Sequence, residues 1–210
     1  IEYGDRYKQA NPLHGLGRVA EELREWEQAR SYYQQAIEID IEYGDRYKQA
    51  NPLHGLGRVA EELREWEQAR SYYQQAIEIF IEYGDRYEQA NPLHQLGIVA
   101  GELREWEQAR SYYQQAIEID IEYGDRFSQA STLHQLGRVA EEVGELSQAK
   151  SYYLQALQIF AEFNDNYTIQ TYSLPRLVAL YQQTQDEEIL VAAADILGVG
   201  VEELRGLLEG

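Results

Sequence analysis

Hydrophobic residues recur along most of the chain at intervals of three and four positions, with polar residues between them. Leu53, Leu56 and Val59 follow this spacing, which places them on one face of a helix. A second run, residues 65–83, carries aromatic residues and alanines at helical spacing, and Gly84 ends it. No segment alternates between apolar and polar residues with a period of two. The pattern therefore predicts pairs of helices and no strands.

This pair of predicted helices returns every forty residues. Segments 1–40 and 41–80 differ only at their last position, where Asp40 becomes Phe80. Segment 121–160 is more divergent, and the pattern decays from residue 161. Segment 81–120 departs from the first at four positions: Lys8/Glu88, Gly15/Gln95, Arg18/Ile98 and Glu21/Gly101. One helix pair cannot bury its own apolar face, so such repeats stack on their neighbours.

The boundaries of the helices can be predicted from turn residues. In the sequence Gly-Asp-Arg at 44–46, glycine favours a helix end and aspartate a helix start. Asn51 and Pro52 could together begin a helix, but Ser131 and Thr132 occupy their places in the fourth repeat. We therefore expect one helix from about residue 46, kinked at Pro52.

The residues that recur in each repeat resemble the signature of the tetratricopeptide repeat (TPR) family over residues 1–160. In the first repeat they are Leu13, Leu16, Gly17, Ala20, Leu23, Trp26, Ala29, Tyr33 and Ala36. The forty-residue period resembles the longer variant found in arrays of bacterial signal-transduction ATPases and in cell-polarity adaptors. This resemblance implies an all-α fold, a right-handed superhelical solenoid of helix-turn-helix TPR units with the first helices on the concave side. Pro12 departs from the family pattern, as does the lack of the usual proline after the second helix.

The chain divides by repetition into two parts. Residues 1–160 form four near-identical forty-residue TPR units, and residues 161–210 form a degenerate fifth repeat plus a C-terminal capping helix. In this tail we predict a helix kinked at Pro175, a helix from Asp186 to Gly198, and a short amphipathic helix over 201–208. Ile1 resembles the end of a preceding second helix, so we expect more protein upstream.

Charge and composition narrow the choice of partners. The formal net charge is −19, from 18 basic and 37 acidic residues, and such a surface repels phosphate backbones and attracts basic partners. No apolar run is long enough to cross a membrane. The chain has no cysteine, which excludes disulfides and cysteine-bound zinc and favours the cytoplasm. We expect no nucleic acid and no membrane among the partners.

Positions 8, 15, 18 and 21, where the third repeat changes, lie on one stripe of the first helix, apart from its predicted packing face. The TPR resemblance implies that this face lines a ligand groove. The predicted partner-binding groove consists of Asn11, His14, Arg18, Glu22, Asn51, His54, Arg58, Glu62, Asn91, His94, Gln95, Ile98, Glu102, His134, Gln135, Arg138 and Glu142. The expected ligand is a protein or peptide, basic, with an apolar anchor over Ile98.

No motif in the sequence predicts catalysis, a cofactor or a metal. The stretch HGLGRVA at 14–20 fits a relaxed dinucleotide-binding pattern, but no strand precedes it and Gly15 is replaced in later repeats. His14, His54, His94 and His134 fall one per repeat, about 10 Å apart or more, which is too far to share a zinc ion. Each is expected to make a hydrogen bond or to contact a ligand. We therefore predict that the protein is not an enzyme.

Two functions fit these observations. The first is a protein- or peptide-binding scaffold that acts through the concave face, as a fragment of a larger regulator or adaptor. The second is an engineered or structural repeat array that self-assembles without a specific ligand. The sequence predicts an uncovered apolar face at the N-terminal end, and large apolar patches usually mark contacts. We therefore also expect a homo-oligomer formed through that end.

Overall fold

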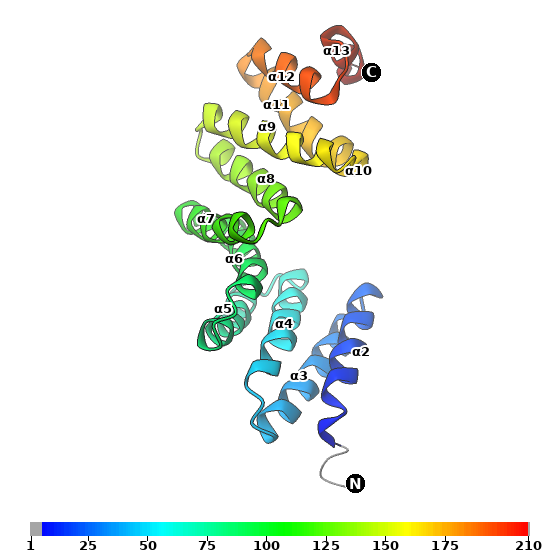
Figure 1. Ribbon diagram of the computed structural model, residues 1–210, viewed down its shortest axis with the longest axis vertical. Coiled ribbons are helices and arrows are strands. Elements are labelled where there is room, and N and C mark those ends of the chain that lie inside the picture. The colour runs from blue at the N-terminus through cyan, green and yellow to red at the C-terminus, as the bar shows by residue number, and fades with distance from the viewer. Residues whose placement is uncertain (1–5, 210) are drawn as a thin grey trace. The chain divides into compact units, whose positions relative to one another are not determined.

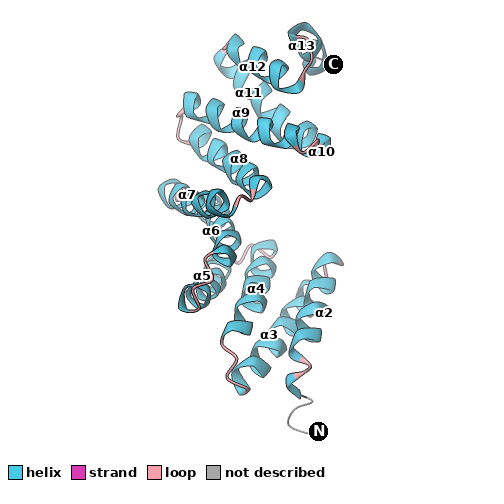
Figure 2. Cartoon of the chain, viewed as in Figure 1, coloured by secondary structure: helices cyan, strands magenta, loops and turns pink. Residues whose placement is uncertain are grey.

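A computed structural model describes residues 6–209, and all regular elements among them are helical (Figure 2). This confirms the predicted all-α fold. The chain divides into two compact units, residues 1–112 and 113–210, and the division falls within helix α7. The predicted right-handed superhelix concerns the arrangement of the whole chain and stays a prediction.

Unit 1 consists of successive helix pairs (Figure 1). Its elements are α2 (Ala10–Glu22), α3 (Trp26–Glu42), η1 (Tyr47–Gln49), α4 (Ala50–Glu62), α5 (Trp66–Glu82), η2 (Tyr87–Gln89), α6 (Ala90–Glu102) and the first part of α7 (Trp106–Tyr123). Helix α2 packs on α3 and α4 packs on α5, while α4 also contacts α3 of the preceding repeat. Helix α4 therefore has two neighbours from second helices, one on either side in sequence.

Unit 2 contains the last full repeat and the tail. Its elements are the rest of α7, α8 (Arg126–Glu142), α9 (Leu146–Glu162), α10 (Asn166–Thr168), η3 (Ile169–Ser173), α11 (Leu174–Thr184), α12 (Glu187–Leu197) and α13 (Val201–Glu209). Asp186 caps α12 by accepting a hydrogen bond from the backbone N–H of Glu188 at 3.1 Å, and Gly198 ends it with a φ of +67°. Both ends of α12 were predicted. Leu204 of α13 is buried in the core of this unit.

The prediction of one helix from residue 46, kinked at Pro52, is wrong. Residues 47–49 form a 3₁₀ turn, and α4 begins at Ala50, so Pro52 lies in its first turn. Proline lacks the N–H that an α-helix would bond to Lys48, and its ring would crowd that carbonyl. The fourth repeat carries Thr132 at this position, and there α8 runs as one helix from Arg126.

Pro175 has a related effect in the tail. The predicted tail helix is interrupted by η3, a π-helical turn over Ile169–Ser173, and α11 begins at Leu174. The wider π turn removes the need for the hydrogen bond that Pro175 cannot donate. The interruption occurs at the place where the sequence predicted a kink.

A tyrosine of the second helix fixes the contact within each pair. A Cβ atom added to Gly57 would lie 2.3 Å from the ring of Tyr73, and one added to Gly137 would lie 2.5 Å from the ring of Tyr153. Real side chains do not approach so closely, so only glycine allows the ring to lie against the backbone. Tyr73 and Tyr153 are fully buried as a result.

The apolar face of a first helix is covered by the preceding repeat. Leu56 and Val59 of α4 pack with Tyr33 and are 2% and 0% exposed. Their counterparts in α2, Leu16 and Val19, are 46% and 51% exposed. The difference comes from position in the chain, because the two helices have the same sequence. Ile1, proposed as the end of a preceding helix, lies outside the described residues.

Within residues 6–209, no helix is both long enough and apolar enough to span a bilayer.

Candidate ligand-binding surface

The polar side chains of the predicted groove come from the first helices α2, α4, α6 and α8. At the two ends of these helices the side chains are exposed. They are Asn11, Asn51 and Asn91 in the first turns, and Glu22, Glu62, Glu102 and Glu142 as the last residues. The structure therefore leaves both rows accessible to a ligand. The residues between them lie differently.

The four histidines are partly buried against tyrosine rings or neighbouring helices. The ring centres of His14 and Tyr33 are 5.6 Å apart, and those of His54 and Tyr73 are 5.4 Å apart. Burial lowers the pKa of His54 to about 4, as it does for His94 and His134. The rings of His54, His94 and His134 are therefore neutral at pH 7. His14, His54 and His134 pack on the tyrosines that organise the repeats.

Position 21 is part of the junction between repeats, which corrects the prediction that the variable stripe lies apart from the packing face. The carboxylate of Glu21 accepts a hydrogen bond from the hydroxyl of Tyr33, in its own repeat. It also accepts one from the guanidinium of Arg58, in the next repeat. Glu21 is therefore largely buried, with 10% of its side chain exposed.

Position 15 also faces the preceding repeat. A Cβ added to Gly55 would lie 2.6 Å from the ring of Tyr33, whereas one added to Gly15 would meet no atom within 4 Å. In the third repeat the corresponding Gln95 forms a hydrogen bond with Tyr73. The exchange of Gly55 for Gln95 therefore changes a contact between repeats. Arg58 and Gln95, both residues of the predicted groove, contact the preceding repeat as well.

Replacing Arg58 by Ile98 removes the cation from one junction. Glu61 accepts a hydrogen bond from the Tyr73 hydroxyl at 2.8 Å, as Glu21 does from Tyr33, but the next repeat offers Ile98 instead of arginine. Burial raises the pKa of Glu61, and the negative charges of Glu62 and Glu102 raise it further. Ile98 itself is half-buried.

A cavity of about 300 Å³ opens between the first helices of repeats 1 and 2. It is lined by Arg18, Glu21, Glu22, Trp26, Arg58 and Glu62. Three carboxylates and two guanidiniums therefore meet there. Because Arg58 is already paired with Glu21, the remaining surface is weakly acidic.

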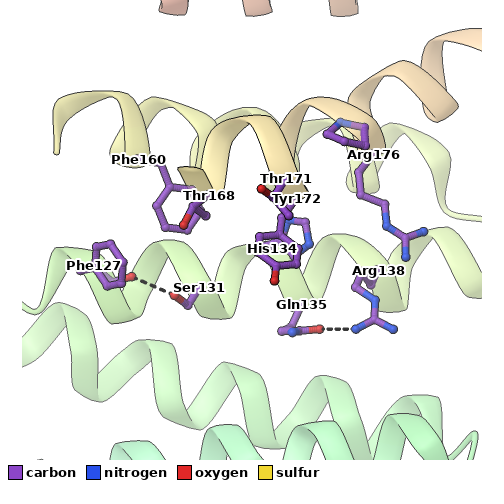
Figure 3. A pocket seen from close by; sticks show the side chains of 11 residues that line it. Phe127, Ser131, His134, Gln135, Arg138, Phe160, Thr168, Thr171, Tyr172 and Arg176 are labelled. Atoms are coloured by element: carbon purple, nitrogen blue, oxygen red, sulfur yellow. Dashed lines mark hydrogen bonds between the residues drawn. The ribbon is translucent and has the colours of Figure 1, made fainter. Parts of the chain in front are cut away.

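A larger cavity of about 560 Å³ lies in unit 2, between α8, α9 and the tail (Figure 3). His134, Gln135 and Arg138 of the predicted groove line it, together with Arg176 of α11 and Tyr172 of η3. Arg138 donates a hydrogen bond to the side-chain oxygen of Gln135 at 3.0 Å. The predicted groove therefore continues here into residues of the tail.

Arg176 repeats the junction chemistry of unit 1. Glu141 accepts a hydrogen bond from the Tyr153 hydroxyl at 2.7 Å, and Arg176 approaches the same carboxylate at 3.6 Å. His134 packs on Tyr153 with ring centres 5.3 Å apart. Sequence reasoning missed Arg176 and Tyr172 because the tail does not keep the repeat spacing. One signal in the sequence could have found Arg176. Glu21 contacts an arginine of the following repeat, and Arg176 follows Glu141 at a similar distance along the chain.

Metal binding finds no support in the part of the chain that the structure describes. No three side chains of histidine, cysteine, aspartate or glutamate come together there in a way that could hold an ion.

The chain belongs to the tetratricopeptide repeat family, whose model matches residues 8–82 and 88–162. Several solved structures share the fold. RapI in its apo form has a TM-score of 0.78 at 20% identity, with 94% of this chain and 71% of that chain covered. BtubC (BKLC) from P. vanneervenii has a TM-score of 0.74 at 18% identity, with 98% of this chain and 83% of that chain covered.

YrrB, described as a TPR protein with an unusual peptide-binding site, has a TM-score of 0.59 at 20% identity. The alignment covers 89% of this chain and 86% of YrrB. These identities show a common fold and no more. A search of curated proteins found no match.

Proposed function

We propose that this protein is a protein- or peptide-binding scaffold that uses the exposed face of its first helices, as part of a larger regulator or adaptor. The observation that carries this proposal is the row of exposed carboxylates in unit 1, formed by Glu22, Glu62 and Glu102. The peptide-binding site named for YrrB supports a ligand of the same class.

The carboxylate row favours a basic ligand. Each member is the last residue of its helix, α2, α4 or α6, where the helix dipole adds further negative charge. Among residues 6–209, none of the three carboxylates has an ion pair or a hydrogen bond to its side chain. Lysine or arginine side chains of a partner can therefore bind them without displacing an existing contact.

The third repeat provides an apolar position beside this row. Ile98 is half-buried, and a Cβ added to Gly101 would approach only Trp106, at 4.0 Å. The absence of a side chain at Gly101 leaves room next to Ile98. Burial of one aliphatic side chain there would contribute roughly 1.5–3 kcal/mol, which can fix the register of a peptide on the acidic face.

The test begins with selection of peptides from a phage-displayed library against the whole chain. We expect enrichment of lysine or arginine flanking a leucine, isoleucine or phenylalanine. The double variant Ile98→Arg with Gly101→Glu restores the residues of the first repeat, and it should bind the selected basic peptides at least tenfold more weakly. Because Arg58 already occurs at this position beside Glu21, the variant should fold as well as the parent. Equal binding by parent and variant would refute the proposal.

The exposed apolar face of α2 supports a second candidate, self-association of a structural array. Leu16, Val19 and Leu23 are 46%, 51% and 65% exposed, although the same residues of α4 need a covering helix. Sedimentation should then show a dimer or larger species, and Leu16→Glu with Val19→Glu should give a monomer. A parent chain that is monomeric at all concentrations would exclude this candidate.

We further propose that binding, rather than catalysis, is the function of the protein. The described histidines pack against the repeat framework, and the ionised groups of the junctions pair with one another. A location in the cytoplasm, expected from the lack of cysteine, remains a prediction.

A further inference from the structure

The cavity of unit 2 differs in charge from the rest of this acidic chain. Two guanidinium groups, those of Arg138 and Arg176, reach it from α8 and α11 (Figure 3). None of the described residues that line it is acidic. In a chain of net charge −19, a cavity with two cations and no lining carboxylate indicates a site for a negatively charged group.

Both arginines have hydrogen-bond donors to spare. Arg138 donates to a neutral partner, the side-chain oxygen of Gln135 at 3.0 Å. Arg176 approaches Glu141 at 3.6 Å, a distance too long for a good hydrogen bond, and that carboxylate already accepts one from Tyr153. Since each guanidinium has five N–H donors, the pair can bind a carboxylate through two parallel hydrogen bonds.

The other end of the cavity is aromatic. Phe127 is 44% exposed, and its ring centre lies 5.6 Å from that of the buried Phe160. Figure 3 shows these two rings at the end opposite to the guanidinium groups, with His134 between the two ends. The Nδ1 atom of His134 is buried and has no hydrogen-bond partner among the described residues.

We propose that this cavity binds an acidic residue of a peptide ligand, with its carboxylate on Arg138 and Arg176. A neighbouring aromatic or branched aliphatic side chain of the peptide packs against Phe127, and the ring of His134 lies between the two ends of the site. This site rests on the proposed function in that its ligand is a peptide. It is distinct from the acidic face of unit 1 in position and in the charge it selects.

The test uses three fluorescein-labelled peptides that differ only in charge. The first has the sequence Gly-Ser-Phe-Asp-Asp-Ser-Gly; the second carries two asparagines and the third two lysines in place of the aspartates. Fluorescence anisotropy with the whole chain at low salt should show the aspartate peptide binding at least tenfold more tightly than the asparagine peptide. Added salt should weaken the binding of the aspartate peptide.

Variants of matched arginine pairs locate the site. Arg138→Gln with Arg176→Gln should weaken binding of the aspartate peptide at least tenfold. Arg18→Gln with Arg58→Gln, which removes the same charge from the cavity of unit 1, should leave it unchanged. Circular dichroism and thermal melting establish that both variants are folded. As an independent readout on the parent chain, the ring resonances of His134 should move when the aspartate peptide is added.

The inference is overturned if the aspartate and asparagine peptides bind equally or if neither binds. It is also overturned if the two double arginine variants weaken binding of the aspartate peptide to the same extent. Its failure is distinguishable from failure of the proposed function. The library-selected basic peptides should bind the Arg138→Gln/Arg176→Gln variant at least as tightly as the parent. Their proposed site on Glu22, Glu62 and Glu102 is unchanged, and the chain loses two cations. The Ile98→Arg/Gly101→Glu variant should bind the basic peptides more weakly and the aspartate peptide as the parent does. This variant therefore tests the site of unit 1 alone.

Discussion

The cavities of the two units are built on the same junction and yet carry opposite charge. In unit 1, Glu21 joins Tyr33 to Arg58, and the cavity beside it contains Glu22 and Glu62 as well. In unit 2, Glu141 joins Tyr153 to Arg176, but the cavity contains no carboxylate among its described lining residues. A shared framework therefore does not determine what a repeat array binds.

The difference in charge between the two cavities arises from side chains that are not held by the contacts between repeats. Where the arginine of the junction is fully engaged, as Arg58 is, the surface takes its charge from the remaining glutamates. Where the arginine is held loosely, as Arg176 is at 3.6 Å, the same residue type can serve a ligand. The tail helix α11 supplies this looser arrangement because it does not follow the repeat spacing.

The largest expected effect comes from giving the fourth repeat the aspartate that the first repeat carries at its last position. This change would place a carboxylate at the aromatic end of the unit 2 cavity. Phe160→Asp should destabilise the fold by about 3–5 kcal/mol, because a buried ring is lost and an unpaired charge is buried. Urea unfolding of the parent and variant measures the difference in the free energy of unfolding.

Asp40→Phe is the matched reverse change and should stabilise the protein by about 1–3 kcal/mol. Asp40 is 2% exposed, one of its carboxylate oxygens has no hydrogen-bond partner among the described residues, and Phe80 occupies the same position in the next repeat. Burial raises the pKa of Asp40 to about 6, so the gain should be larger at pH 7 than at pH 4. Destabilisation by Asp40→Phe would show that the carboxylate of Asp40 makes a stabilising contact that phenylalanine cannot replace.

An effect of similar size is expected at the tyrosine contact common to both units. Gly57→Ala and Gly137→Ala should each destabilise the fold by about 2–3 kcal/mol, because the new methyl group overlaps the ring of Tyr73 or Tyr153. Gly15→Ala serves as the control; it meets no atom and should stabilise α2 by roughly 0.5–1 kcal/mol. Chemical unfolding of the three variants decides whether the two junctions are equivalent.

A smaller effect, of about 1–2 kcal/mol, should appear when the pH falls from 6.5 to 4. Burial, aided by the charges of Arg138 and Arg176, lowers the pKa of His134 to about 4. The unfolded chain therefore binds a proton below pH 6.5 that the folded chain does not bind, and stability is lost as the pH falls. His134→Gln should remove this part of the pH dependence, which is read from the difference between the parent and variant unfolding curves.

The smallest effect is expected at the turn between the helices of each pair. Arg24, Arg64 and Arg104 have a φ of +59°, whereas the fourth repeat has Gly144 at this place, with a φ of +80°. Arg64→Gly should raise the free energy of unfolding by about 0.5–1 kcal/mol, because glycine adopts positive φ without strain. A thermal melt of this variant with an unchanged or lower midpoint would show that the arginine side chain offsets the strain.

Much of the fold could be predicted because periodicity and turn residues act locally. The starts and ends of α5 and α12 follow from residues such as Gly84, Asp186 and Gly198. The start of α4 was missed, since the effect of Pro52 depends on a carbonyl four residues earlier. Repetition of the sequence located the repeats, while the tail, which lost the repeat spacing, could be predicted only in outline.

The candidate site was harder to predict, because the exposure of a side chain depends on the neighbouring repeat. The exposed rows of asparagines and glutamates follow from helical spacing alone. The pairing of Glu21 with Arg58 joins residues 37 positions apart, and no pattern within one helix indicates it. Likewise, the contact of Gly55 with Tyr33 requires knowing how two repeats pack.

The buried alternation between Asp40 and Phe80 also affects how much stability the array would lose with a repeat. Lys48 follows Asp40 and lowers its pKa, opposing the effect of burial, whereas Glu88 follows Phe80 at the same offset. Deletion of residues 41–80 would join Asp40 to Glu88 and bring two carboxylates together. Deletion of residues 49–88 removes as much chain but keeps Asp40 with Lys48. Loss of a repeat should therefore cost less stability when the deletion begins after Lys48 than when it begins directly after Asp40.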